Sequence, residues 1–272
     1  MNSPDAPAWT KGKLLAGKTI IVTGCSSGIG SETARLCKQL GADVLGVDRN
    51  KSTDHVDELY LADLGDPDTI HELVDVLPAG ANGLVNCAGV PPTQPAEVVL
   101  RVNLVGLKYL TERLVPKLAD GASIVNLASL AGFGWQQSID SIKASEHLDF
   151  AGIPSFLAAH NITNKEGRSY FFSKEALIVW TLQNRWRWRD RGIRMNAVSP
   201  GPVNTPIIQD FLDTLGKRAE EDARVMDRVG TPQDIAPVIA FMLSEMSGWL
   251  RGTNIGSDGG MSSFLLCNQH DL

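Results

Sequence analysis

Cysteine, histidine and long apolar runs are all scarce in this sequence. The four cysteines include no C-x-x-C pair, which gives no sign of a disulfide framework. The five histidines are scattered without metal-ligand spacing, so we expect no metal centre. The longest apolar run, Ile235 to Leu243, contains Pro237 and is far shorter than the roughly 20 residues that a membrane span requires. We therefore expect no membrane partner.

Positive charge is not in excess either, because 25 Lys and Arg stand against 31 Asp and Glu, a formal net charge of −6. This balance argues against a polyanion partner. The run Arg185 to Arg189 interleaves arginine with tryptophan and could stack on nucleic-acid bases. It lies, however, at the C-terminal end of a predicted helix, where cations are favourable in any case. We expect no nucleic-acid partner.

Residues 1–16 lack the apolar core of a signal peptide, and Pro4 and Pro7 mark a loose segment. We expect a flexible leader over residues 1–16, a single folded domain over residues 17–272 and a cytoplasmic protein. At 272 residues, the chain is long enough to bury about three quarters of its unfolded surface. It therefore needs no disulfide to be stable.

Short β-branched runs alternate with segments of helical periodicity. The predicted strands are Thr19 to Val22, Val44 to Val47, Tyr60 to Leu61, Leu84 to Val85, Ser123 to Leu127, Arg194 to Val198 and Thr253 to Ile255. The predicted helices are Ser31 to Leu40, Pro67 to Leu77, Pro95 to Leu114, Tyr170 to Arg189 and Pro232 to Leu243. This alternation predicts an α/β fold: a single-domain, Rossmann-like, doubly wound parallel sheet that binds its ligand at the carboxyl ends of its strands.

A glycine-rich turn joins the first predicted strand to the first helix, with glycine at positions 24, 28 and 30. Glycine lets backbone approach a pyrophosphate, and the helix N-terminus offers it N–H groups. A tight turn without a ligand is the alternative. Asp48 ends the second strand, 18 residues after Gly30, where a carboxylate accepts hydrogen bonds from ribose hydroxyls. Asp48 would repel a 2′-phosphate and so favours NAD over NADP, whereas Arg49 could grip that phosphate.

Tyr170 and Lys174 lie one helical turn apart, which places a phenol and an ammonium on the same helix face. Reduction of a carbonyl leaves an alkoxide, and a phenol can deliver the proton that it needs. We expect Lys174 to lower the pKa of Tyr170 from about 10 toward neutrality. The spacing alone also suits an ordinary helix pair. Combined with the glycine turn, it predicts hydride transfer between a nicotinamide and an alcohol or carbonyl compound.

These motifs resemble the short-chain dehydrogenase/reductase family over roughly residues 18–260. The matching stretches are Thr23–Gly30 (T-G-x-x-x-G-I-G), Asp63-Leu64, Asn86–Gly89, Val102–Gly106 around Asn103, Ile124–Ser129, Tyr170–Lys174 and Asn196–Gly201. Two positions depart from the family pattern. Cys87 replaces the second Asn of the usual N-N-A-G, and Ala128 replaces the first serine of a common pair, which leaves Ser129 as the candidate there.

The resemblance implies a catalytic set of Asn103, Ser129, Tyr170 and Lys174. Ser129 would hydrogen-bond the substrate oxygen, Tyr170 would transfer the proton, Lys174 would also reach the nicotinamide ribose, and Asn103 would hold a water. The resemblance also implies NAD as the cofactor. The implied NAD-binding residues are Gly24, Ser26, Ser27, Gly28, Ile29, Gly30, Asp48, Asp63, Leu64, Asn86, Ala88, Gly89, Tyr170, Lys174, Pro200, Gly201, Val203 and Thr205.

Ser129 and Tyr170 are 41 residues apart, farther than in most of the family. The insertion, about residues 136–169, contains the helical-looking stretches Ser145 to Phe150 and Ile153 to Ala159. It resembles the family branch of 3α-hydroxysteroid dehydrogenase/carbonyl reductases and coniferyl-alcohol dehydrogenases. Helices flanking this region build the oligomer interface in much of the family. We therefore expect a homo-oligomer, and a dimer rather than a tetramer.

Residues 202–228 resemble the family's substrate loop, with Lys217 to Arg224 expected as a solvated helix face. We expect a small-molecule alcohol or ketone substrate, either a hydroxysteroid (3α-type) or a bulky aromatic compound. The alternatives are a coniferyl- or aryl-alcohol dehydrogenase, an NADP-linked reductase that uses Arg49, and a catalytically silent NAD-binding regulator. Such a regulator should have lost Ser129, Tyr170 or Lys174, and all three are present.

Overall fold

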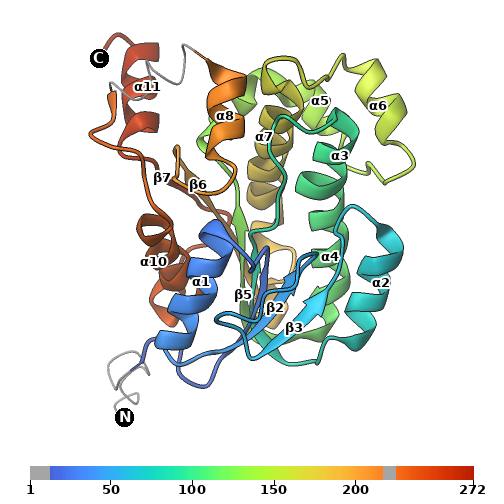
Figure 1. Ribbon diagram of the computed structural model, residues 1–272, viewed down its shortest axis with the longest axis vertical. Helices are drawn as coiled ribbons and strands as arrows, with labels where there is room; N and C mark the ends of the chain where they lie inside the picture. Colours follow the sequence, from blue (N-terminus) through green and yellow to red (C-terminus); the bar gives the residue numbers. More distant parts are fainter. Residues whose placement is uncertain (1–12, 217–224) are drawn as a thin grey trace.

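A seven-stranded parallel sheet forms the centre of the protein (Figure 1). The computed structural model describes residues 13–216 and 225–272. The strands are β1 (Thr19–Thr23), β2 (Asp43–Asp48), β3 (Glu58–Leu61), β4 (Ala81–Asn86), β5 (Leu118–Leu127), β6 (Arg194–Pro200) and β7 (Asn254–Ser257). Their order in the sheet is β3-β2-β1-β4-β5-β6-β7, with every neighbouring pair parallel. The predicted doubly wound α/β fold is confirmed.

Helices cover both faces of this sheet (Figure 1). They are α1 (Gly28–Gln39), α2 (Pro67–Val76), α3 (Ala96–Leu100), α4 (Leu107–Leu114), α5 (Ile139–Ala144), α6 (Ile153–Ala159), α7 (Arg168–Gln183), α8 (Ile208–Leu215), α10 (Pro232–Leu243) and α11 (Met261–Gln269). Helices α1 and α10 lie on one face, and α2, α4 and α7 on the other. A π-helical segment, Arg101–Gly106, joins α3 to α4.

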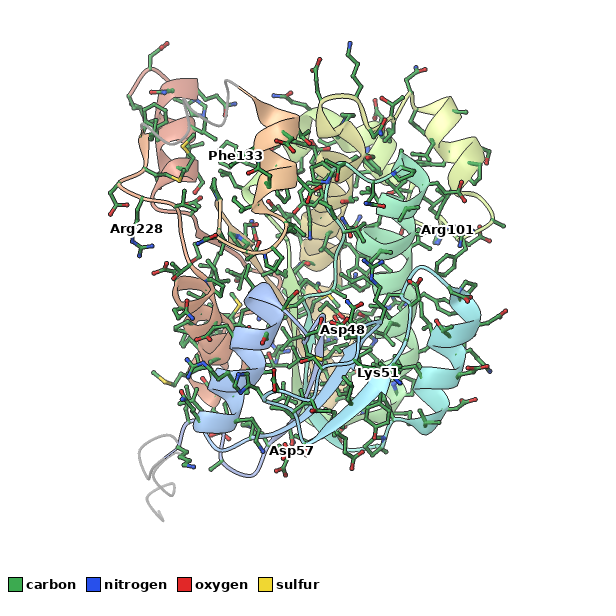
Figure 2. All side chains as sticks on the ribbon, viewed as in Figure 1. Asp48, Lys51, Asp57, Arg101, Phe133 and Arg228 are labelled. Carbon is green, nitrogen blue, oxygen red and sulfur yellow. The ribbon has the colours of Figure 1, made fainter. Side chains whose placement is uncertain are left out.

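Alternate residues of each strand supply the two cores, because successive side chains of a strand point to opposite faces. Val85, Val125 and Val198 pack beneath α1 and α10. Their neighbours Leu84 and Ile124 pack beneath α4 and α7. Both faces are therefore apolar, as parallel sheets require. Asp48, the last residue of β2, lies above Asp57, just before β3, in Figure 2. Because all strands are parallel, their carboxyl ends lie on the same side of the sheet as Asp48.

A chain of buried polar side chains crosses the middle of the sheet. The Asn86 side-chain amide donates to Thr111 Oγ1 at 2.9 Å and to Asn126 Oδ1 at 2.8 Å. The Asn126 amide in turn donates to Thr181 Oγ1 at 2.9 Å. All four side chains are buried, so these bonds form in a low-dielectric interior. They fix the ends of β4 and β5 relative to α4 and α7.

The structure corrects three details of the sequence prediction. The insertion forms helix α6 at Ile153–Ala159, as predicted. The prediction of a helix at Ser145 to Phe150 is wrong, because the second helix of the insertion, α5, ends at Ala144. Helix α7 ends at Gln183 rather than Arg189, and the Arg-Trp run continues in short 3₁₀ turns. The Asn184 side chain donates to the Trp180 carbonyl at this end, a local competitor of helical bonding. Helix α11 was not predicted.

The structure describes only the last four residues of the expected leader, residues 1–16. Residues 1–12 lie outside the described residues, as does the expected helix face Lys217 to Arg224. Leu15, however, is completely buried, and its N–H donates to the Leu40 carbonyl at 2.9 Å. Residues 13–16 therefore belong to the folded structure. None of the helices within residues 13–216 and 225–272 has the length and apolar character that crossing a membrane would demand.

Candidate active site

The glycine turn between β1 and α1 leaves no room for side chains. Gly24 has φ +69°, and a Cβ there would lie 2.8 Å from the Ala88 backbone. A Cβ on Gly30 would lie 2.1 Å from the Gly24 carbonyl oxygen. Any larger residue would push these segments apart, so the close approach of the turn to the loop after β4 depends on glycine. Helix α1 begins at Gly28, and its first N–H groups therefore face the end of the sheet.

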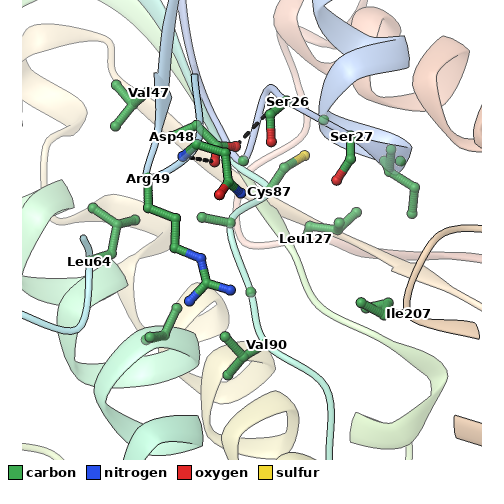
Figure 3. Close-up of a pocket in the computed structure, with 18 of the residues that line it drawn as sticks. Ser26, Ser27, Val47, Asp48, Arg49, Leu64, Cys87, Val90, Leu127 and Ile207 are labelled. Carbon is green, nitrogen blue, oxygen red and sulfur yellow. Dashed lines mark hydrogen bonds between the residues drawn. The ribbon is translucent and has the colours of Figure 1, made fainter. Parts of the chain in front are cut away.

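A pocket of about 240 Å³ runs along the carboxyl ends of β1, β2, β4 and β5 (Figure 3). Twelve of the predicted cofactor residues line it: Gly24, Ser26, Ser27, Gly28, Ile29, Gly30, Asp48, Asp63, Leu64, Ala88, Gly89 and Thr205. Residues that the sequence analysis did not assign also line it, including Asn50, Cys87, Val90, Leu127 and Ile207. Several of these flank the recognised motifs directly, so proximity in sequence was a signal that could have found them.

Asp48 is fixed at the rim of this pocket by two backbone donors. Its Oδ2 accepts from the Ser26 N–H at 3.0 Å and its Oδ1 from the Asn50 N–H at 2.9 Å (Figure 3). The residue is only 8% exposed. The carboxylate therefore joins the glycine turn to the end of β2. Arg49, next in sequence, also lines the pocket, and Figure 3 shows its side chain extending along it.

Other predicted cofactor residues lie outside the pocket lining. The Asn86 side chain points into the polar chain beneath the site, and its Oδ1 has no hydrogen-bond partner among the described residues. Val203 is buried and forms a β-bridge with Gly230, and the Gly201 N–H donates to the Ser257 carbonyl. Pro200 ends β6.

Asn103 lies in the π-helical segment and holds the loop that follows β4. Its Oδ1 accepts from the Val90 N–H at 2.8 Å, and its Nδ2 donates to the Val90 carbonyl at 3.0 Å. π-Helical segments often occur at functional sites. The side chain is completely buried. In this structure Asn103 positions a pocket-lining residue, while its expected role in holding a water stays a prediction.

The structure brings Ser129, Tyr170 and Lys174 together beyond the end of β5. The Ser129 side chain lies close enough to the Tyr170 phenol to act against the rise of its pKa. Lys174 Nζ donates to the Leu127 carbonyl at 2.7 Å and lies 5.6 Å from the centroid of the Tyr170 ring. Tyr170 is 7% exposed and Lys174 is 5% exposed. A phenol, a hydroxyl and an amine therefore share one dry site, the combination that a proton transfer to or from an alcohol oxygen requires.

Burial shifts both ionisable groups toward their neutral forms. It raises the pKa of Tyr170 to about 12, against the opposing effect of the hydrogen bond with Ser129. It lowers the pKa of Lys174 to about 8, with a small opposing effect from Cys87. The expected fall of the Tyr170 pKa toward neutrality is therefore wrong for this structure. Desolvation of the phenolate is the largest cause, and Lys174 Nζ donates to the Leu127 carbonyl.

Known proteins match the chain over nearly its whole length. The family model described as short chain dehydrogenase matches residues 18–141, and the one described as Enoyl-(Acyl carrier protein) reductase matches residues 153–262. The coniferyl-alcohol dehydrogenase of Pseudomonas sp. (strain HR199 / DSM 7063) is 41% identical, covering 92% of this chain and 98% of that protein. The 3-alpha-hydroxysteroid dehydrogenase/carbonyl reductase of Comamonas testosteroni is 29% identical, covering 90% and 97%.

A solved structure agrees with these relatives. The 3-alpha-hydroxysteroid dehydrogenase from Pseudomonas sp. B-0831, complexed with NADH, superimposes with a TM-score of 0.77 at 27% identity. The match covers 91% of this chain and 98% of that one. The likeness therefore extends over most of the chain.

The low pKa of Lys174 predicts a pH-dependent stability. Its pKa is about 8 in the folded protein and 10.5 when unperturbed, so between these values the unfolded chain binds more protons and the free energy of unfolding rises with pH. Below pH 8 Lys174 is protonated in both the folded and the unfolded chain, so the free energy of unfolding no longer changes with pH through this group. Lys174→Met removes this pH dependence. Urea unfolding at pH 7 to 10.5 should show the variant's stability relative to wild type falling by about 3 kcal/mol over this window. Parallel pH profiles would contradict the prediction.

Proposed function

Because this chain belongs to the short-chain dehydrogenase/reductase family, we propose that it is an NAD-dependent dehydrogenase of a secondary or aryl alcohol, working reversibly with the carbonyl compound. The observation that carries this proposal is the cluster of Ser129, Tyr170 and Lys174. It lies beside the pocket along the strand ends, which we call the nucleotide-type pocket. A silent NAD-binding regulator would not need these three groups in one site.

The pocket residues fit a dinucleotide. The glycine turn excludes side chains at the point where backbone must approach a pyrophosphate, and α1 offers N–H groups there. Asp48 would accept from the adenosine ribose, Asp63 would bond the adenine, and Thr205 would hold the carboxamide. When bound, the nicotinamide supplies or accepts the hydride. NADH in the similar 3-alpha-hydroxysteroid dehydrogenase supports this assignment.

The proton is handled by the residues of this chain. Ser129 would hydrogen-bond the substrate oxygen, and Tyr170 would remove the hydroxyl proton in oxidation or return it in reduction. The pKa of about 12 opposes the phenolate that oxidation needs. Movement of Lys174 Nζ from the Leu127 carbonyl toward the phenol oxygen would stabilise that phenolate. Alcohol oxidation should therefore favour alkaline pH.

The relatives divide the substrate proposal into two candidates. The relative with 41% identity is named for coniferyl alcohol, which supports a bulky aryl alcohol. The relatives named for 3α-hydroxysteroids match at 29% and 27% identity and support a steroid alcohol. Reduced-cofactor formation at alkaline pH, with NAD or NADP and both alcohol classes, distinguishes them. Tight NAD binding without turnover of either class would favour the regulator.

Tyr170→Phe removes the proposed acid–base group and leaves the ring in place. We expect turnover to fall by about 10²- to 10⁴-fold. The dissociation constant of NADH, measured by fluorescence, should stay near the wild-type value and serves as the control for folding. Turnover equal to wild type would rule out Tyr170 as the catalytic group.

Asp48→Ala tests the choice of NAD. Removing the carboxylate abolishes the repulsion of a 2′-phosphate, so the ratio of kcat/KM for NADP to that for NAD should rise by about 10-fold or more. Asp48→Asn is the matched control, because it keeps an oxygen for the Ser26 or Asn50 N–H but loses the charge. It should shift the ratio in the same direction. An unchanged ratio in both variants would support the rival NADP-linked reductase that uses Arg49.

The insertion covers a helical face with the chain's own residues. Leu100, Leu104 and Phe172 from α3, the π-segment and α7 form a buried cluster with Ile153 and Phe156 of the insertion. Lys108 Nζ donates to the Glu146 carbonyl at 2.8 Å, and the Phe150 ring packs edge-on against Tyr109, with centroids 5.8 Å apart. In much of the family this region contacts other subunits. We infer that it is closed to a second copy here, which leaves a dimer through another face.

Multi-angle light scattering tests the dimer. The expected mass is twice that of the chain over a tenfold dilution in the micromolar range. A tetramer would show that the insertion does not close this face, and a monomer would show that no other face takes its place.

A further inference from the structure

Helix α8 lies directly over the catalytic cluster. The Phe211 ring stands edge-on to the Tyr170 ring, with centroids 4.9 Å apart and planes at 80°. Tyr170 is only 7% exposed, and Phe211 packs against the core cluster that contains it. Leu212, the next residue on α8, is 44% exposed. Phe211 is thus the residue that α8 turns inward onto the phenol.

Two further contacts hold α8 in this position. Thr93 Oγ1, in the loop after β4, donates to Asp210 Oδ1 at 2.6 Å. Near the other end of the helix, Thr214 packs closely on Gly167 at the start of α7, where an added Cβ would lie 3.1 Å from Thr214 Cγ2. Phe211 lies between these two anchoring points. These contacts hold the helix segment that carries the ring.

An alcohol substrate must bring its oxygen within hydrogen-bond distance of the Tyr170 phenol and the Ser129 hydroxyl. The pocket along the strand ends is lined by Leu127, two residues before Ser129, and by Ile207, four residues before Phe211, but its described lining does not include Tyr170. Phe211 packs against the ring that the alcohol must approach. We propose that Phe211 controls access of the alcohol to Tyr170 and must leave the tyrosine ring before substrate binds. This inference rests on the proposed function.

The electrostatics of the covered site agree with this role. Burial raises the pKa of Tyr170 to about 12, and an edge-on aromatic ring contributes to that burial. Displacement of the ring exposes the phenol and favours its ionisation. The same movement that admits the alcohol thus makes Tyr170 a better base. With Phe211 in place, burial favours the protonated phenol.

Nitration of tyrosine by tetranitromethane tests the proposal without any turnover. The reagent attacks exposed phenolate, and the chain has only three tyrosines, so Tyr60 and Tyr109 serve as internal standards. Mass spectrometry of the Tyr170 peptide should show nitration of Phe211→Ala about 2- to 10-fold faster than wild type, as expected for loss of one aromatic contact. Phe211→Leu, which keeps an apolar cover, should stay near wild type. Leu212→Ala is the matched control on the same helix and should not change nitration.

A kinetic measurement separates access from substrate recognition. If Phe211 controls access, Phe211→Ala raises kcat/KM for a small secondary alcohol and for a bulky aryl alcohol by similar factors. A fall confined to the bulky alcohol would make Phe211 a wall of the binding pocket and overturn the proposal, as would unchanged Tyr170 nitration. Absence of alcohol turnover in the wild type would defeat the proposed function alone, since the nitration result is read independently.

Discussion

The site depends above all on the buried hydrogen-bond chain formed by Thr111, Asn86, Asn126 and Thr181. These bonds lie where water cannot compete, so a misplaced partner would leave a buried amide unsatisfied. The chain leaves one favourable position for α7 relative to the ends of β4 and β5. Tyr170 and Lys174 stand on α7, while Ser129 follows β5. The distances among these three groups therefore follow from a polar network that does not touch the alcohol.

Placing Tyr170 and Lys174 in the interior has an energetic cost, because burial disfavours their charged forms. The surroundings favour neutral Tyr170 and neutral Lys174, because both groups are almost completely buried. Alcohol oxidation needs the phenolate of Tyr170, and a charged Lys174 would stabilise it. The burial that positions the two groups thus opposes the charged forms that oxidation uses, as is common where activity and stability compete. One bond from Lys174 Nζ to the Leu127 carbonyl compensates part of this cost.

The parts that sequence could predict are those set by local geometry. The turn at Gly24 and Gly30 admits only glycine, and the Tyr170–Lys174 spacing follows from one helical turn. The strands were predictable because buried parallel strands are continuous apolar runs. The Thr93–Asp210 bond joins residues 117 apart, and no local pattern encodes it. The same holds for the inward role of Asn86 and for the pKa of Tyr170, because both depend on what folding packs around the residue.

The segment from Thr205 to Phe211 joins the two halves of the site. Thr205 packs against Gly28, where an added Cβ would lie 3.3 Å from its Cγ2, and Ile207 lines the nucleotide-type pocket. Phe211, six residues after Thr205, covers the tyrosine. Four of the six residues after Thr205, Ile208 to Phe211, belong to α8. The residues of one helix are joined by backbone hydrogen bonds, so they tend to move together. A shift of α8 that lifts Phe211 from Tyr170 would therefore also move Ile207 in the wall of the nucleotide-type pocket. We expect occupancy of that pocket to affect access to the phenol for this reason.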